Sequence, residues 1–171
     1  VAMKGDTTYV DTDEPEYFLR YFDFETDYSR IMAELSEFGE LREALACGGG
    51  LRILRQQPFE ATVSFIISAN NNIKRIQGII ERICARFGGE RGIAPFPSRE
   101  ELSTLSVEDF SALGCGFRDR YLYNTVPLLT REYLDAIGNM PQELAKKELC
   151  KLMGIGPKVA ECILLFAYKK T

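Results

Sequence analysis

The sequence predicts a mainly α-helical protein that carries only a small antiparallel β-sheet at its start. Apolar residues recur at helical spacing from Glu14 onward, and glycine or serine turn signals separate the segments. Residues 1–11 alternate weakly instead, around Lys4-Gly5-Asp6, which is typical of a hairpin. We therefore expect residues 1–13 to be the remnant of an N-terminal β domain and residues 14–171 to form a helical domain.

The helical segments are placed in order by their start and stop signals. Asp27 is a predicted N-cap, Pro58 opens an apolar helix, and Ser98 begins a capping box. Because the helix after Pro58 is apolar on all sides, we expect it to be a buried central element. The sequence predicts further helices that start near residues 14, 41, 73, 106 and 118. The last of these is expected to reach Ile137, with a kink or interruption at Pro127.

The composition is that of an ordinary folded protein. The chain has 171 residues, of which 46% are hydrophobic, so it can bury at least one sizeable core. Its apolar runs are shorter than the roughly 18 residues of a membrane span, and its start lacks the pattern of a signal peptide. We therefore expect a soluble, intracellular protein that binds no membrane. The odd count of five cysteines and their wide spacing argue against a disulfide framework and a zinc site.

The charge distribution and the titratable residues limit the classes of function that the chain can have. The formal net charge of −4 argues against a protein that coats nucleic acid, since nonspecific affinity requires many Lys and Arg residues. Basic residues nevertheless gather at Lys74-Arg75, at Arg118 to Arg120 and from Lys146 to Lys158, which permits one local basic face. Each cluster, taken alone, is also consistent with a solvated helix surface. The chain has no histidine, so acid–base chemistry falls to carboxylate, lysine, cysteine or tyrosine side chains.

Residues 145–168 have the pattern of a helix-hairpin-helix that grips a DNA backbone. Apolar residues at helical spacing flank a bend at Gly154-Ile155-Gly156. Glycines permit backbone angles and close approaches that a side chain prevents. Pro157 suits the first turn of the second helix, whose free amides attract an anion. Lys158 follows in that turn, where the helix dipole disfavours a cation, and such a broken rule is typical of a functional site.

Two other interpretations of this segment stay open. Gly-Ile-Gly-Pro is also a common turn, and Lys158 is then an ordinary surface charge. A nucleotide-binding loop fits less well, because the preceding segment is predicted to be a helix rather than a strand and the full glycine spacing is missing.

Three separated motifs resemble those of the 8-oxoguanine DNA glycosylases in order and spacing. They are Gln57 to Ile76 with its Asn70-Asn71-Asn72 triplet, Leu113 to Tyr121, and the hairpin through Cys162. The similarity extends from about Tyr17 to the end of the chain. It implies the helix-hairpin-helix DNA glycosylase fold and a base-excision repair enzyme with glycosylase and β-elimination AP lyase activities. The implied partner is double-stranded DNA with 8-oxoguanine opposite cytosine, bound by a monomer that acts on DNA inside the cell.

The resemblance assigns four residues to the gap that remains when a damaged nucleotide is flipped out of the duplex. Asn70 would pair with the orphaned cytosine, and Arg75 and Arg118 would contact the same base. Phe117 would enter the base stack as an aromatic wedge. From the residues alone, the Asn triplet is also consistent with a helix-capping turn, and Phe117 with a core residue.

The same resemblance assigns the chemistry to Lys158. Its amine would attack C1′ and form a Schiff base, which requires the amine to be held largely uncharged by desolvation or positive neighbours. Cys162, one helical turn further on, would line the base pocket beside it. A free cysteine is more often a small buried hydrophobe, so that interpretation stays open. No required cofactor is implied.

The bend of the hairpin would hold the DNA backbone. The resemblance implies that a phosphate is bound by the amides of Gly154, Gly156 and Val159. It also implies a structural monovalent or divalent cation, which would bridge to DNA from the carbonyls of Cys150, Leu152 and Ile155.

The chain departs from the family pattern after the hairpin. The family has an essential aspartate there, in a Pro-Val-Asp segment, and Thr171 comes before it. We therefore expect a chain that is truncated at both ends, lacks the family's C-terminal helices and is incomplete for activity. Glu161 is not expected to replace the aspartate, because its spacing points it away from Lys158 and Cys162. Two alternatives stay open, a non-catalytic helix-hairpin-helix DNA-binding module and a glycosylase for alkylated bases.

Overall fold

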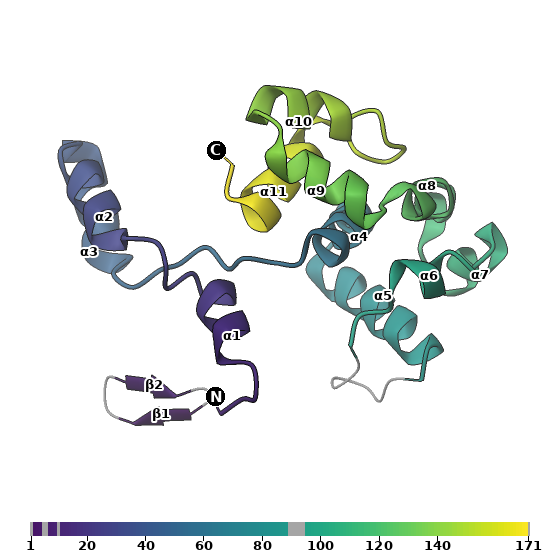
Figure 1. The fold of residues 1–171 in the computed structure, drawn as a ribbon, viewed down its shortest axis with the longest axis horizontal. Coiled ribbons are helices and arrows are strands. Elements are labelled where there is room, and N and C mark those ends of the chain that lie inside the picture. Colours follow the sequence, from purple (N-terminus) through teal and green to yellow (C-terminus); the bar gives the residue numbers. More distant parts are fainter. Residues whose placement is uncertain (1, 5–6, 10, 89–94, 171) are drawn as a thin grey trace. The chain divides into compact units, whose positions relative to one another are not determined.

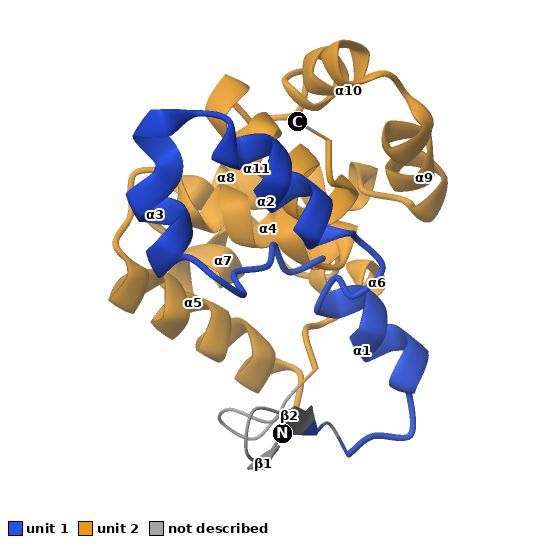
Figure 2. Cartoon of the chain, turned by 90° about the vertical axis from the view of Figure 1, so that its left-hand side faces the viewer, with its two compact units in different colours: residues 1–55 blue, residues 56–171 orange. Residues whose placement is uncertain are grey.

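The computed structural model of this protein describes residues 2–4, 7–9, 11–88 and 95–170. It is mainly helical, which confirms the helical part of the fold class expected from the sequence (Figure 1). The chain divides into two compact units, residues 1–55 and residues 56–171, which are coloured separately in Figure 2. None of the helices in the described part of the chain is both long and apolar enough to cross a membrane.

The described part of the first unit contains two short strands and four short helical segments. Strands β1 (Ala2–Lys4) and β2 (Thr7–Tyr9) pair antiparallel, with Ala2 opposite Tyr9. The turn residues Gly5 and Asp6, expected between them, lie outside the described residues. The helical segments are α1 (Pro15–Tyr21), α2 (Tyr28–Ser36), the 3-10 turn η1 (Gly39–Leu41) and α3 (Arg42–Cys47). Asp27 caps α2 by accepting a hydrogen bond from the Arg30 amide, as the sequence predicts.

The second unit is a set of helices around one hydrophobic core. Its described elements are α4 (Pro58–Ser68), α5 (Ile73–Arg86), α6 (Arg99–Leu102), α7 (Val107–Ala112), the 3-10 turn η2 (Gly116–Arg118), α8 (Asp119–Thr125), the 3-10 turn η3 (Val126–Leu128), α9 (Arg131–Asn139), α10 (Gln142–Leu149) and α11 (Pro157–Tyr168). Helices α10 and α11 pack together and form the predicted helix-hairpin-helix. We call residues 150–156, which connect them, the hairpin bend.

Local capping signals place most helix boundaries in this unit. Ser98 forms the predicted capping box with Glu101, and Ser106 forms a second one with Asp109. Gly114 has a φ of 84° and ends α7 in a Schellman arrangement, in which its own amide and the next one donate to carbonyls of α7. The helix expected from Arg118 to Ile137 is interrupted at Pro127, which lies in η3 between α8 and α9.

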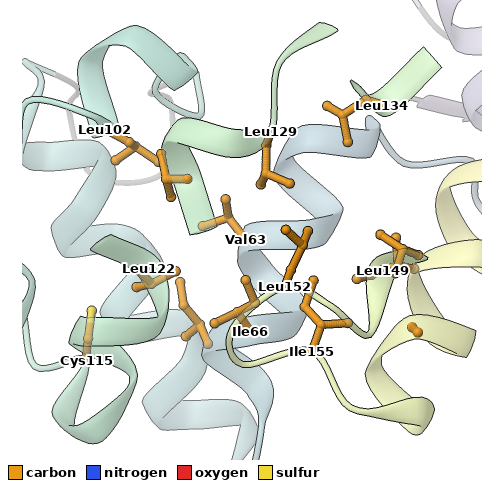
Figure 3. Close-up of a cluster of buried hydrophobic side chains, with 14 of the residues drawn as sticks. Val63, Ile66, Leu102, Cys115, Leu122, Leu129, Leu134, Leu149, Leu152 and Ile155 are labelled. Carbon is orange, nitrogen blue, oxygen red and sulfur yellow. The ribbon is translucent and has the colours of Figure 1, made fainter. Parts of the chain in front are cut away.

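The central helix α4 is buried, as its apolar sequence predicts. Val63 and Ile66 have no exposed surface, and α4 packs against α11. The start of the unit is also joined to α11, because the Gln56 amide donates to the Phe166 carbonyl at 2.9 Å. Figure 3 shows Val63 and Ile66 in one cluster with Leu152 and Ile155. The hairpin bend is therefore anchored in the hydrophobic core.

Candidate functional site

The hairpin bend needs a glycine at one of its two glycine positions. Gly154 has a φ of 87°, and a Cβ added to it would lie 2.8 Å from Cβ and Cδ2 of Tyr121. Gly156 has an ordinary φ of −88°, and a Cβ added there would have no atom within 4 Å. The prediction that both glycines adopt backbone angles that a side chain prevents is therefore wrong for Gly156.

Helix α8 holds the hairpin bend through two side chains. The buried hydroxyl of Thr125 donates to the Met153 carbonyl at 2.8 Å, and Tyr121 packs against Gly154. The Tyr121 ring also contacts the Phe117 ring edge to face, with centroids 5.8 Å apart. The hairpin bend and Phe117 are therefore connected through one aromatic side chain.

The lysine of the hairpin lies at the start of α11. Pro157 is the first helical residue, and Lys158 follows in the first turn, as the sequence predicts. The Lys158 side chain is exposed, whereas Cys162 is partly buried. The described residues therefore do not supply the burial of this amine that the sequence analysis expects. Glu161 forms an ion pair with Lys146 of α10, which agrees with the prediction that its carboxylate points away from Lys158.

Backbone groups at the hairpin bend are available for ligands. Within the described part of the chain, no acceptor is bound by the amides of Gly154, Gly156 and Val159. Free amides at the start of a helix favour an anion. The Leu152 carbonyl accepts from the Ile155 amide at 3.2 Å and retains a second lone pair. Carbonyl oxygens of this kind suit a hard cation, so the donor set fits the expected ion.

Two residues of the Asn triplet bond to helix ends, and the third has an exposed side chain. Asn72 caps α5 by accepting from the Arg75 amide at 2.9 Å, and Asn71 donates to the Ile67 carbonyl near the end of α4 at 3.1 Å. Asn70 has a φ of 50°, and its exposed side chain makes no hydrogen bond to the described residues. The capping interpretation therefore holds for Asn71 and Asn72 and leaves the Asn70 amide group available.

Arg118 fixes the backbone on which Asn70 stands. Its side chain is 1% exposed, and its guanidinium donates to the Ala69, Asn70 and Cys115 carbonyls. The distances from Nε to Ala69 and from Nη2 to Asn70 are 2.8 and 2.9 Å. The guanidinium also lies 4.3 Å from the centroid of the Phe117 ring. This arginine, predicted as a cytosine contact, therefore also joins two turns of the protein.

The other two predicted gap residues are on the surface beside Arg118. Phe117 is 55% exposed, so it is not a core residue. Arg75 is exposed, and its Nη2 donates to the Gly114 carbonyl at 3.4 Å. The structure thus brings Asn70, Arg75, Phe117 and Arg118 together around residues 113–118. Lys158 and Cys162 belong to α11, which follows the hairpin bend that Tyr121 contacts.

Three residues that hold this group together were not predicted from the sequence. They are Tyr121, Thr125 and Arg82, whose Nε donates to the Leu113 carbonyl at 2.8 Å. Arg82 lies seven residues after Arg75, which places both on the same face of α5. That spacing was the available signal. The residue types of Tyr121 and Thr125 do not indicate these roles, because each side chain contacts backbone atoms of a distant turn.

In fold, the chain resembles DNA glycosylases of known structure. The fold alone is shared with the 3-methyladenine DNA glycosylase of Archaeoglobus fulgidus, at a TM-score of 0.73 and 21% identity over 95% of this chain and 59% of that chain. Residues 2–62 match a family described as the N-terminal domain of 8-oxoguanine DNA glycosylase.

A curated relative and the solved structures of one enzyme agree with this match. The N-glycosylase/DNA lyase OGG1 of Arabidopsis thaliana is 34% identical over 164 residues, which are 87% of this chain and 44% of that protein. The crystal structure of the 8-oxoguanine glycosylase/lyase of Clostridium acetobutylicum has a TM-score of 0.85 and 36% identity, over 94% of this chain and 59% of that chain. The same enzyme in complex with double-stranded DNA that contains cytosine opposite 8-oxoguanine has a TM-score of 0.84.

The chain is therefore similar, over nearly its whole length, to 8-oxoguanine DNA glycosylases. It spans about half the length of the curated relatives that it matches.

Proposed function

We propose that this chain acts in base-excision repair as part of a DNA glycosylase/AP lyase that removes 8-oxoguanine opposite cytosine. One observation carries the proposal. The Asn70 backbone, the exposed Phe117 ring and the hairpin bend belong to one set of contacts made by Arg118 and Tyr121. A rigid arrangement of this kind grips a duplex and fills the gap left by a flipped nucleotide.

The gap is filled by four side chains in this proposal. Phe117 enters the base stack, because an apolar ring that is exposed on the surface can replace a stacked base. Asn70 offers both a donor and an acceptor to the orphaned cytosine, and Arg75 and Arg118 donate to acceptors of the same base. The Asn70 backbone is fixed beforehand by Arg118, so little conformational freedom is lost on binding.

Lys158 is the proposed nucleophile. Its uncharged amine attacks C1′ of the flipped nucleotide, the N-glycosidic bond breaks, and the base leaves with the bonding electrons and takes up a proton. The amine gives up a proton and the ring oxygen takes one up as the sugar ring opens to the Schiff base. β-Elimination then removes a proton from C2′ and breaks the C3′–O bond, and the 3′ phosphate leaves with the bonding electrons. A nucleotide packed over the start of α11 supplies the desolvation that the described residues do not. Cys162 lines the pocket on the next turn of the helix.

The hairpin bend holds the DNA backbone in this proposal. The free amides of Gly154, Gly156 and Val159 bind one phosphate, and the positive end of α11 strengthens that contact. The carbonyls of Cys150, Leu152 and Ile155 would hold a monovalent or divalent cation, which neutralises part of the phosphate charge when bound.

The first unit completes the proposed organisation. We infer that β1 and β2 within residues 1–13 are the remnant of a family N-terminal sheet, and that the helical glycosylase domain covers residues 14–171. The protein acts as a monomer, since a single set of gap-filling residues suffices for one lesion. Its substrate places its action on DNA inside the cell.

Borohydride trapping tests the function. We expect the chain to be trapped on a duplex that carries a preformed abasic site opposite cytosine, because Schiff-base formation there needs the amine but no glycosidic cleavage. Lys158→Gln removes the adduct. Lys147→Gln, which removes an exposed charge from α10, retains it and is the matched control. A second duplex with intact 8-oxoguanine tests base removal.

Each other outcome contradicts part of the proposal. An adduct that persists in Lys158→Gln rejects this residue as the nucleophile. Equal affinity for damaged and undamaged duplexes, with no adduct, identifies the non-catalytic DNA-binding module. Preferential release of a methylated purine identifies a glycosylase for alkylated bases.

A further inference from the structure

Three successive carbonyls after α7 each accept a hydrogen bond from a different arginine. The pairs are Arg82 Nε with Leu113 at 2.8 Å, Arg75 Nη2 with Gly114 at 3.4 Å, and Arg118 Nη1 with Cys115 at 3.2 Å. We call residues 113–116 the arginine-held turn. It leads directly into Phe117.

Arg82 makes the shortest of these three bonds. It also packs against the turn, since a Cβ added to Gly114 would lie 2.6 Å from Arg82 Nη2. Arg82 and Arg75 lie on one face of α5, and Ile79 between them has no exposed surface. The helix that presents Arg82 is therefore fixed in the core.

The arginine-held turn needs such a contact. Gly114 and Gly116 both have positive φ, at 84° and 61°, and glycine gives a backbone more freedom than any other residue. The Leu113 carbonyl lies at the end of α7, where a helix leaves its last carbonyls without an internal partner and favours a positive charge. The Arg82 guanidinium restrains this flexible backbone, and it supplies both a donor and a positive charge to the Leu113 carbonyl.

We propose that Arg82 is a positioning residue for the Phe117 wedge. By holding the arginine-held turn in one conformation, it fixes the direction in which the Phe117 ring projects. The role rests on the proposed function, in which that ring enters the duplex. Arg82 itself need not touch DNA.

Hydrogen exchange in the DNA-free chain tests the contact by itself. The reporters are the Gly114 and Cys115 amides, which donate to carbonyls of α7. We expect Arg82→Met to speed their exchange about tenfold and Arg82→Lys to restore part of the protection, because an ammonium can still donate to the Leu113 carbonyl. The matched control is Arg86→Met, which removes a charge from the next turn of α5.

Base unstacking tests the consequence. A 2-aminopurine placed beside an 8-oxoguanine–cytosine pair becomes brighter when a wedge opens the stack. We expect Arg82→Met to reduce this signal at least threefold at saturating protein, and Phe117→Ala to abolish it. Affinity for undamaged duplex should change less than threefold in both Arg82→Met and Arg86→Met, and Arg82→Lys should recover part of the signal.

The two measurements separate the possible failures. Equal exchange rates in Arg82→Met and Arg86→Met overturn the inference at the level of the contact. Faster exchange with a fluorescence signal like that of Arg86→Met overturns the positioning role. If exchange behaves as expected but the unmodified chain never brightens the probe, the proposed function is what has failed, and the positioning role falls with it.

Discussion

Gly154 lies against the Tyr121 ring so closely that no side chain fits between them. The contact joins the hairpin bend to α8, and the Tyr121 ring also packs edge to face against the Phe117 ring. Packing in a protein interior transmits small displacements, so the hairpin and the wedge are coupled mechanically.

Replacing Gly154 is expected to destabilise the second unit. In Gly154→Ala, the left-handed backbone costs roughly 1–2 kcal/mol, and the collision with Tyr121 adds about 1–3 kcal/mol. Urea unfolding measures the loss. Gly156→Ala is the control, because its φ is ordinary and its Cβ has free space, so its stability should change by less than about 0.5 kcal/mol. Equal losses in the two variants would show that the Tyr121 contact does not matter.

Arg118 is expected to be needed for folding as well as for any contact with a base. Arg118→Met leaves the Ala69, Asn70 and Cys115 carbonyls without this donor, and we expect a loss of about 3 kcal/mol. Arg118→Lys should recover little of it, because one ammonium cannot reproduce the planar fork. Thermal unfolding of both variants beside Arg120→Met, which removes an exposed charge two residues on, measures the difference. A melting temperature equal to that of Arg120→Met contradicts the joining role.

Substitutions in the asparagine triplet should separate a loss of stability from a loss of DNA recognition. Asn72→Ala loses the cap of α5 and should cost about 1 kcal/mol in denaturant unfolding. Asn70→Gly keeps the left-handed backbone without strain, so its stability should be nearly unchanged. Its preference for an abasic site opposite cytosine over one opposite adenine should fall about tenfold or more, because the amide that meets the base is gone. A retained preference would remove Asn70 from the interface.

Alkaline pH is expected to weaken the fold through Cys115. Burial raises the pKa of this thiol from 9.0 to about 11. Between these values the unfolded chain releases the proton and the folded chain keeps it, so the unfolded state binds fewer protons and stability falls as pH rises. Urea midpoints at pH 8, 9.5 and 11 measure the slope. Cys115→Ala should reduce the slope and the exposed Cys47→Ala should not; unchanged slopes in both would exclude the buried thiol as a cause.

The sequence allows the helical class and most helix boundaries to be predicted, because these depend on local chemistry. Ser98 and Ser106 carry their capping partners three residues away, and Gly114 ends α7 by its own backbone preference. The break at Pro127 could be anticipated as a kink or an interruption, but not resolved further. Whether a proline bends or ends a helix depends on the packing of the segments on both sides.

The site could be predicted only in part. Asn70, Phe117 and Lys158 could be proposed as site residues because a motif depends on residue types in order. The partners of Arg82 and Thr125 are backbone carbonyls, which every residue has, so the sequence shows nothing of these contacts. The exposure of Lys158 likewise depends on what covers the start of α11 in space, and spacing along the chain does not report it.

The packing of α4 on α11 has a consequence for synthesis on the ribosome. The first helix of the second unit finds its main partner in the last, and the Gln56 bond to Phe166 joins the two ends of that stretch. The part of the α4 surface that α11 covers therefore stays exposed until translation has passed Tyr168. Such long-range closure slows folding and leaves the nascent chain open to aggregation in the meantime.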